Sequence, residues 1–161
     1  MLSKKKSFIN SIRHPVKSRL FMFFKLPSAF FSGVRVKAID DKQCEVSVPY
    51  KWFTQNPFRS TYFACLSMAA ELSTGALAMS NIYGHKPGLS MLVLKVESEY
   101  FKKATGRTLF TCEDGSIFEQ AIEESIATGE AKVVRARSIG RNAAGETIAE
   151  FFISWSFKAR K

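Results

Sequence analysis

NPFRSTYFACLSMAAELSTGALA, residues 56–78, is the stretch that decides the fold of this chain. From Ser60 to about Met79 it is rich in Ala and Leu and apolar nearly all round, which predicts a buried helix. Between residues 60 and 84 the only carboxylate is Glu71, and Lys and Arg are absent. Burial of an unpaired carboxylate is costly, so Glu71 must either find hydrogen-bond donors or have a raised pKa. Either condition is useful beside a substrate.

Patterns typical of strands precede this helix. Residues 33–40 and 43–50 predict two short strands joined by a tight turn. Residues 52–60 read as a loop. Earlier still, residues 15–31 predict a helix that stops around Pro27 and is followed by a short turn.

After the helix, residues 90–104 predict a long strand with two different faces. One face is expected to carry Ser90, Leu92, Leu94, Val96, Ser98 and Tyr100. The other face is expected to carry Lys95, Glu97 and Glu99 and therefore to meet solvent.

The rest of the chain predicts a further strand, a short helix and a closing hairpin. These elements are expected at residues 106–115, 116–129, 132–140 and 147–160. The last strand has one apolar face, formed by Ala149, Phe151, Ile153, Trp155 and Phe157. An antiparallel sheet with one long hydrophobic helix after its second strand is an α+β domain. A curled sheet wrapped around a central helix is the hotdog architecture, which is the fold we expect.

The excess positive charge belongs to the N-terminal part of the chain. The 161 residues carry a net charge of +10, and residues 1–37 hold nine of the 24 Lys and Arg and no acid. The remaining 124 residues are nearly neutral, with 15 bases and 14 acids. We therefore divide the chain into a basic, Phe-rich helical arm, residues 1–32, and a hotdog domain, residues 33–161.

The arm allows several interpretations. In the simplest, its aromatic side chains cover the domain and its lysines are solvated. Alternatives are contact with an anionic membrane surface, binding of a polyanion such as ligand phosphates, and a mitochondrial presequence. The run LFMFF, residues 20–24, is too short to span a membrane. A nucleic-acid partner would rest on the arm alone and is not expected.

The cysteines and histidines give no sign of a metal or redox site. The chain has an odd number of cysteines, and they are far apart: Cys44, Cys65 and Cys112. This pattern is typical of free thiols in a reducing compartment, so we expect a cytoplasmic protein. Membrane association through the arm stays an option. Neither the cysteines nor His14 and His85 form a metal-ligand pattern. No metal or cofactor is expected.

Several residues around the central helix form a recognisable spacing. Asn56 is followed 15 residues later by Glu71. Further positions match the same family pattern. They are Ser60 and Tyr62-Phe63-Ala64 between these two residues, and Gly88-Leu89-Ser90 and residues 102–107, KKATGR, after the helix. On these residues the chain resembles the hotdog-fold acyl-CoA thioesterases over roughly residues 33–158. The resemblance is to the phenylacetyl-CoA thioesterase-like group and its uncharacterised relatives, whose domain has no known function.

The resemblance implies a role for each residue. Glu71 would be the general base or nucleophile, the Phe63 amide would bind the oxyanion, and Asn56 would hold the thioester carbonyl or the water. Ser90 would orient the water or Glu71. From their positive charge, apart from the resemblance, we expect Arg59 and the arm to help hold the phosphates of coenzyme A. The remaining substrate contacts would be Ser60, Tyr62 and Ala64. In this family the site is built across a dimer, so we expect a homodimer or a dimer of dimers.

Each of these residues also has a structural interpretation. Glu71 can be a structural carboxylate, Asn56 can start a turn before Pro57, and Ser60 can be the N-cap of the helix. Tyr62, Phe63 and Ala64 replace the family's His-Gly-Gly and would crowd an approaching thioester. Two functions therefore stay open. One is hydrolysis of a fatty or aromatic acyl-CoA or acyl-carrier thioester, and the other is non-catalytic binding of an acyl chain or a partner protein.

Overall fold

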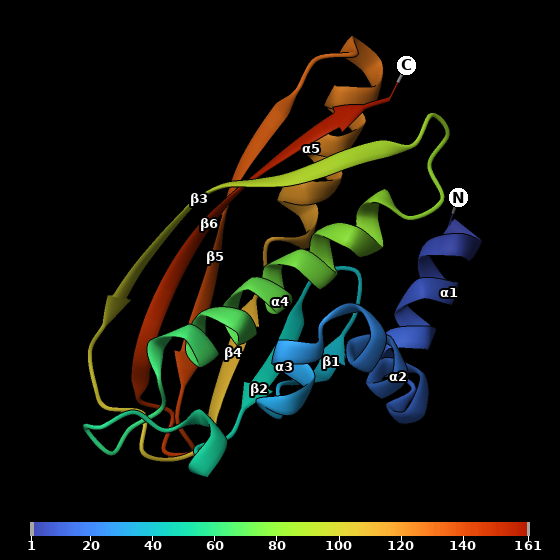
Figure 1. The fold of residues 1–161 in the computed structure, drawn as a ribbon. Coiled ribbons are helices and arrows are strands. Elements are labelled where there is room, and N and C mark those ends of the chain that lie inside the picture. The colour runs from blue at the N-terminus through green and yellow to red at the C-terminus, as the bar shows by residue number, and fades with distance from the viewer. Residues whose placement is uncertain (1, 161) are drawn as a thin grey trace.

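The computed structural model describes residues 2–160 and shows a six-stranded antiparallel sheet that curls around one long helix, α4 (Phe63–Ile82) (Figure 1). Along the sheet the strands follow the order β1-β2-β4-β5-β6-β3. Their bounds are β1 Arg35–Ile39, β2 Cys44–Val48, β3 Leu89–Tyr100, β4 Thr108–Cys112, β5 Lys132–Arg141 and β6 Thr147–Ala159. The predicted α+β architecture, with a central helix after the second strand, is confirmed.

The N-terminal arm is helical and contains one helix that was not predicted from the sequence. Helix α1 (Leu2–Arg13) is that helix, and it is followed by α2 (Pro15–Lys25) and α3 (Pro27–Phe31). The predicted break at Pro27 is confirmed, because proline lacks the N–H that an uninterrupted helix needs there. Helix α2 starts with Pro15 in its first turn, and the His14 side chain accepts a hydrogen bond from the Lys17 N–H at 3.4 Å.

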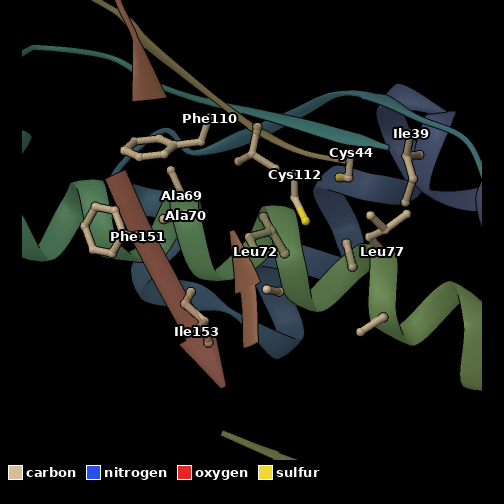
Figure 2. Close-up of a cluster of buried hydrophobic side chains, with 14 of the residues drawn as sticks. Ile39, Cys44, Ala69, Ala70, Leu72, Leu77, Phe110, Cys112, Phe151 and Ile153 are labelled. Carbon is tan, nitrogen blue, oxygen red and sulfur yellow. The ribbon is translucent and has the colours of Figure 1, made fainter. Parts of the chain in front are cut away.

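Helix α4 fills the concave face of the sheet and forms the centre of the core. Figure 2 shows Ala69, Ala70 and Leu77 of α4 packed among side chains of the strands, including Phe110 and Phe151. By length and composition α4 could cross a membrane, but most of it is buried inside the protein, as in the core helix of a globular domain. The small residues let α4 and the sheet approach closely.

Polar side chains on this buried helix are satisfied locally. The Ser73 hydroxyl donates to the Ala70 carbonyl at 2.7 Å and lies 2.7 Å from the Ser138 hydroxyl. The Thr74 hydroxyl donates to the Glu71 backbone carbonyl at 3.0 Å and accepts from Trp155 Nε1 at 2.9 Å. Because their hydrogen bonds are made, these groups can be buried at little cost.

Strand β3 contains a bulge that exchanges its two faces. Val93 lies opposite Trp155 and Lys95 lies opposite Ser154, so Leu94 is an extra residue in β3. One extra residue shifts the alternation, and inward positions become outward beyond it. The predicted common face from Ser90 to Tyr100 is therefore wrong. The inward residues are Leu89, Met91 and Val93 before the bulge and Val96, Ser98 and Tyr100 after it.

The outer face of β3 beyond the bulge is solvated, as predicted. Glu97 forms an ion pair with Lys95 at 2.9 Å and accepts a hydrogen bond from Arg135 of β5 at 3.1 Å. The hydrogen bonds from Lys95 and Arg135 hold the pKa of the Glu97 carboxyl below its ordinary value.

The later predicted elements are also confirmed. Helix α5 (Gly115–Thr128) joins β4 to β5, and β5 pairs with β6 as a hairpin. In its turn, the Asn142 side-chain oxygen accepts hydrogen bonds from the N–H groups of Ala144 and Glu146. The predicted apolar face of the last strand is buried.

Candidate active site

The loop before α4 is closed by Asn56. Its side-chain oxygen accepts hydrogen bonds from the N–H groups of Phe58 at 3.0 Å and Ser60 at 3.2 Å. Its Nδ2 lies 3.1 Å from the Ser60 hydroxyl, and its backbone N–H donates to the Ser60 carbonyl at 2.9 Å. Arg59 has a left-handed φ of 59° in this tight loop. In the single chain Asn56 therefore performs the turn role, and one N–H of its amide has no acceptor among residues 2–160.

Helix α4 begins at Phe63, later than predicted, and its N-cap is Tyr62. The expected N-cap role of Ser60 is wrong, because its hydroxyl is engaged with Asn56 and lies before the helix. The Tyr62 side chain makes no capping hydrogen bond. Among residues 2–160, the backbone N–H groups of Phe63 and Ala64 have no acceptor. Free N–H groups at a helix start, reinforced by the helix dipole, suit a developing oxyanion.

A hollow of about 610 Å³ lies beside this helix start. We call it the helix-start hollow, and its lining includes Asn56, Ser60, Tyr62, Phe63, Tyr100 and Lys102. The Tyr62 and Phe63 rings meet edge to face, with their centroids 4.9 Å apart. The structure thus brings four of the predicted site residues together. Arg59 is exposed on the neighbouring loop, and neither Arg59 nor Ala64 lines the hollow.

Glu71 lies in the wall of a different cavity, of about 560 Å³. We call it the Glu71 cavity, and its mainly apolar wall includes Met22, Leu72, Gly75, Met79, Met91 and Trp155. No donor among residues 2–160 pairs with the half-buried Glu71 carboxylate, and desolvation raises its pKa above the ordinary value. The structure therefore places an unpaired carboxylate beside apolar space large enough for a small ligand.

Gly75 leaves the room that this carboxylate occupies. A Cβ atom added to Gly75 would lie 3.2 Å from Glu71 Oε1 and 3.2 Å from the Trp155 ring. Such contacts are tighter than ordinary van der Waals packing. The glycine one turn after Glu71 therefore allows the carboxylate and the indole to share this part of the wall.

One chain does not bring the helix start and Glu71 together. Glu71 is eight residues beyond Phe63, which at 1.5 Å per residue corresponds to about 12 Å along the helix. The helix-start hollow and the Glu71 cavity have no lining residue in common. A substrate atom at the helix start is therefore out of reach of the carboxylate of the same chain.

A comparison with known protein families identifies the chain. The family model described as "Domain of unknown function (DUF4442)" matches residues 17–156. The chain belongs to the DUF4442 family. No curated protein matches it. The match begins within α2, so the α2 residues that line the Glu71 cavity lie inside the DUF4442 domain.

Solved structures similar to this DUF4442 chain include proteins described as thioesterases. A Pseudomonas aeruginosa protein of unknown function, described as a "Probable Thioesterase", is 18% identical, with a TM-score of 0.76 over 91% of this chain and 97% of that one. A second thioesterase from Pseudomonas aeruginosa, solved as a mutant, is 15% identical, with a TM-score of 0.65 over 89% and 94%. A Haemophilus influenzae thioesterase is 12% identical, with a TM-score of 0.63 over 87% and 88%. At these identities the likeness shows the fold, and the predicted hotdog fold is confirmed.

Ser90 of this DUF4442 chain is not brought to Glu71. Its hydroxyl donates to the Lys158 carbonyl at 3.1 Å, and its neighbours Leu89 and Met91 line the Glu71 cavity instead. Ser90 precedes the bulge and lies on the outer face of the sheet. The orienting role expected for Ser90 therefore has no geometric support within one chain.

The contribution of the N-terminal arm to the wall of the Glu71 cavity was not predicted from the sequence. This wall includes three residues at a spacing of four: Ser18 and Met22 of α2, and Leu26, its C-cap. That helical spacing was a signal, because it places the three residues on one face of α2. Its interpretation was hidden by the exposed aromatic residues Phe23 and Phe24 that lie between these positions in the sequence.

Proposed function

We propose that the protein is an acyl-thioester hydrolase whose two active sites are each shared by the two chains of a homodimer. The observation that carries the proposal is the Glu71 carboxylate, which is half-buried, lacks a hydrogen-bond donor among residues 2–160 and has a raised pKa. A carboxyl group with a raised pKa in an apolar cavity is suited to act as a general base. The likeness in fold to thioesterases supports the choice of reaction.

The dimer would form through β3. This strand ends the sheet and leaves one edge unpaired. Leu92 and Leu94 are exposed, and so are Val96 and Tyr100, which lie on the inner face of the sheet beyond the bulge. A long edge strand with exposed apolar side chains can pair with another chain, and a twofold axis is the commonest symmetry of such pairs.

Pairing of two β3 strands would join the two halves of the site. In an antiparallel pair centred on the middle of the strand, Leu89 of one chain lies opposite Tyr100 of the other. Leu89 lines the Glu71 cavity and Tyr100 lines the helix-start hollow. The carboxylate of one chain would thereby approach the Phe63 amide of the other.

The proposed reaction is attack of water on the thioester carbonyl. Glu71 takes one proton from the water, and the resulting hydroxide forms a bond to the carbonyl carbon. The carbonyl oxygen becomes an oxyanion and accepts a hydrogen bond from the Phe63 N–H of the other chain. The intermediate then collapses, the carbon–sulfur bond breaks, and the proton held by Glu71 passes to the leaving thiolate. The products are the free acid and the thiol.

Both cavities are mainly apolar and each is lined by two cationic residues, Lys25 and Arg160 in the Glu71 cavity and Lys102 and Lys103 in the helix-start hollow. We assign one end of the substrate to each cavity. The Glu71 cavity is mainly apolar and would hold the fatty or aromatic acyl group. Lys102 and Lys103 line the helix-start hollow, and Arg59 is exposed on the adjacent loop. These cations would contact the phosphates of coenzyme A or of an acyl carrier.

A second function is favoured by the crowding at the helix start. The Asn56 side chain is occupied by its own loop, and the Tyr62 and Phe63 rings flank the place where a thioester would approach. In that case the protein would bind an acyl chain or a partner protein without turnover, and Glu71 would be a structural carboxylate.

Thioester cleavage by wild type and Glu71→Gln distinguishes the two functions. The assay uses short, medium, long and aromatic acyl-CoAs and an acyl-carrier thioester, with free thiol as the readout. We expect at least about a hundredfold loss in Glu71→Gln, or ~3 kcal/mol of transition-state stabilisation. Glu123→Gln, an exposed carboxylate on α5, is the matched control and should retain full activity. A well-folded wild type that cleaves none of these thioesters would favour the binding function.

A further inference from the structure

The arm exposes a continuous apolar face to solvent. Its members are Val16, Leu20, Phe23 and Phe24 of α2 and Phe31 of α3, with exposed fractions of 59%, 53%, 44%, 71% and 54%. We call this set the arm face. At about 100° per residue, the four α2 residues lie on one side of the helix, opposite the buried Ser18 and Met22. A helix that buries one face and exposes a second apolar face has an unpartnered surface.

The surroundings of the arm face are positively charged. Lys17 is exposed beside it, and no carboxylate pairs with Lys17 among residues 2–160. Arg19 is held over the Phe30 ring at 3.8 Å and donates to the Val34 carbonyl at 3.2 Å. The sequence has no acid before Asp40. An occupant of this surface must therefore be apolar at its centre and anionic at its margins.

We propose that the arm face docks onto the surface of an anionic lipid membrane. The Phe and Leu side chains enter the boundary between headgroups and acyl chains, and Lys17 contacts the anionic headgroups. Charge argues against a second copy of the same face as the occupant, because two such basic surfaces repel each other. The arm face is also compatible with pairing through β3, because it lies on the side of α2 that faces away from the Glu71 cavity, whereas β3 residues Leu89 and Met91 line that cavity.

The position of the arm face connects it to the Glu71 cavity. Helix α2 presents the arm face on one side, while Met22 and Leu26 on another side line that cavity. An acyl chain leaving the membrane would thus pass around a single helix to reach apolar space. This last step rests on the proposed function, whereas membrane docking does not.

Co-sedimentation with lipid vesicles tests the proposal with the full chain. We expect binding to vesicles that contain phosphatidylserine, weak binding to phosphatidylcholine alone, and weaker binding as salt is raised. The double variant Leu20→Ser with Phe24→Ser should lose at least about tenfold in binding, and so should Lys17→Glu. Val133→Ser, which removes an equally exposed apolar side chain on β5, is the matched control and should bind like wild type.

Several outcomes would overturn it. One is a wild-type protein that does not bind phosphatidylserine vesicles, whether or not it binds an acidic protein instead. Another is a Leu20→Ser with Phe24→Ser variant that binds as wild type while Lys17→Glu does not, because that pattern marks a soluble polyanion as the ligand. Cleavage of a water-soluble short-chain thioester, measured in parallel, separates the two proposals. Neither Leu20, Phe24 nor Lys17 lines the Glu71 cavity, so their variants should keep that activity.

Discussion

Glu71 is the residue at which the sequence was most informative. A single carboxylate in an otherwise uncharged apolar helix predicted a perturbed group, and the structure places it unpaired in an apolar wall with a raised pKa. The roles of its neighbours were less predictable. Whether Asn56 faces a ligand or closes its own loop depends on hydrogen bonds with Ser60 and Phe58, which spacing along the chain does not show.

The pH dependence of stability should report the burial of Glu71. A carboxyl whose folded-state pKa is raised above its unfolded value of about 4.3 costs stability once it ionises. Wild type should therefore lose stability relative to Glu71→Gln as pH rises from the unfolded value through the raised folded value, and the difference should then level off. Thermal unfolding of both proteins across this range measures it. A difference that is constant with pH, or that favours wild type at high pH, would contradict the assignment.

At Phe63 the backbone N–H that would bind the oxyanion can be deleted by mutation while helix α4 stays intact. Proline is well tolerated at the first position of a helix, and Tyr62 already has the extended backbone that precedes a proline. Phe63→Pro removes the N–H, whereas Phe63→Ala removes only the side chain. We expect Phe63→Pro to lower kcat by about 10²–10³-fold relative to Phe63→Ala. Equal kcat values in the two variants would show that this amide does not act in catalysis.

At the scale of elements, strands and helices were predictable where a local pattern repeats. The central helix, the β5–β6 hairpin and α5 follow such patterns. The bulge at Leu94 was not predictable, because Leu92, Leu94 and Val96 continue an alternation that the extra residue breaks. Helix α1 was missed because its basic, weakly apolar sequence gains its stability from packing of Ile9 and Ile12 on the domain.

Gly140 on β5 is a test of how tightly this sheet packs. A Cβ atom there would lie 2.6 Å from the ring of the fully buried Phe110. Gly140→Ala should therefore destabilise the fold by about 1–3 kcal/mol in urea unfolding, as overpacked cores do. Gly106→Ala is the matched control, since its Cβ meets nothing within 4 Å, and its stability should stay the same or rise slightly. Equal stability of the two variants would mean that Phe110 can move aside.

At the scale of the whole molecule, the two separate cavities could not be predicted from the sequence. Their walls combine residues from distant segments, as when Met22 of α2, Met91 of β3 and Trp155 of β6 surround the same space as Glu71. The division of charge between arm and domain was visible in the sequence. Which side of α2 stays exposed was not, because that depends on where α2 packs.

Assembly through β3 should be sensitive to charge on its exposed side chains. Lysines on an edge strand oppose pairing with another strand. We expect wild type to sediment as a dimer at micromolar concentration and Leu92→Lys with Leu94→Lys to sediment as a folded monomer without thioesterase activity. Val133→Lys, at a similarly exposed position on β5, should remain dimeric. A wild type that is monomeric at this concentration would contradict the shared site.

The most direct test of the shared site mixes two inactive variants. Glu71→Gln and Phe63→Pro are each purified, then mixed in equal amounts under conditions that exchange subunits. In a mixed dimer with shared sites, one site carries both defects and the other has an intact Glu71 and an intact Phe63 amide. Because half of the randomly formed dimers are mixed, the account predicts recovery of about one quarter of the wild-type activity. If subunits exchange and no activity returns, each site is built from a single chain and the account is wrong.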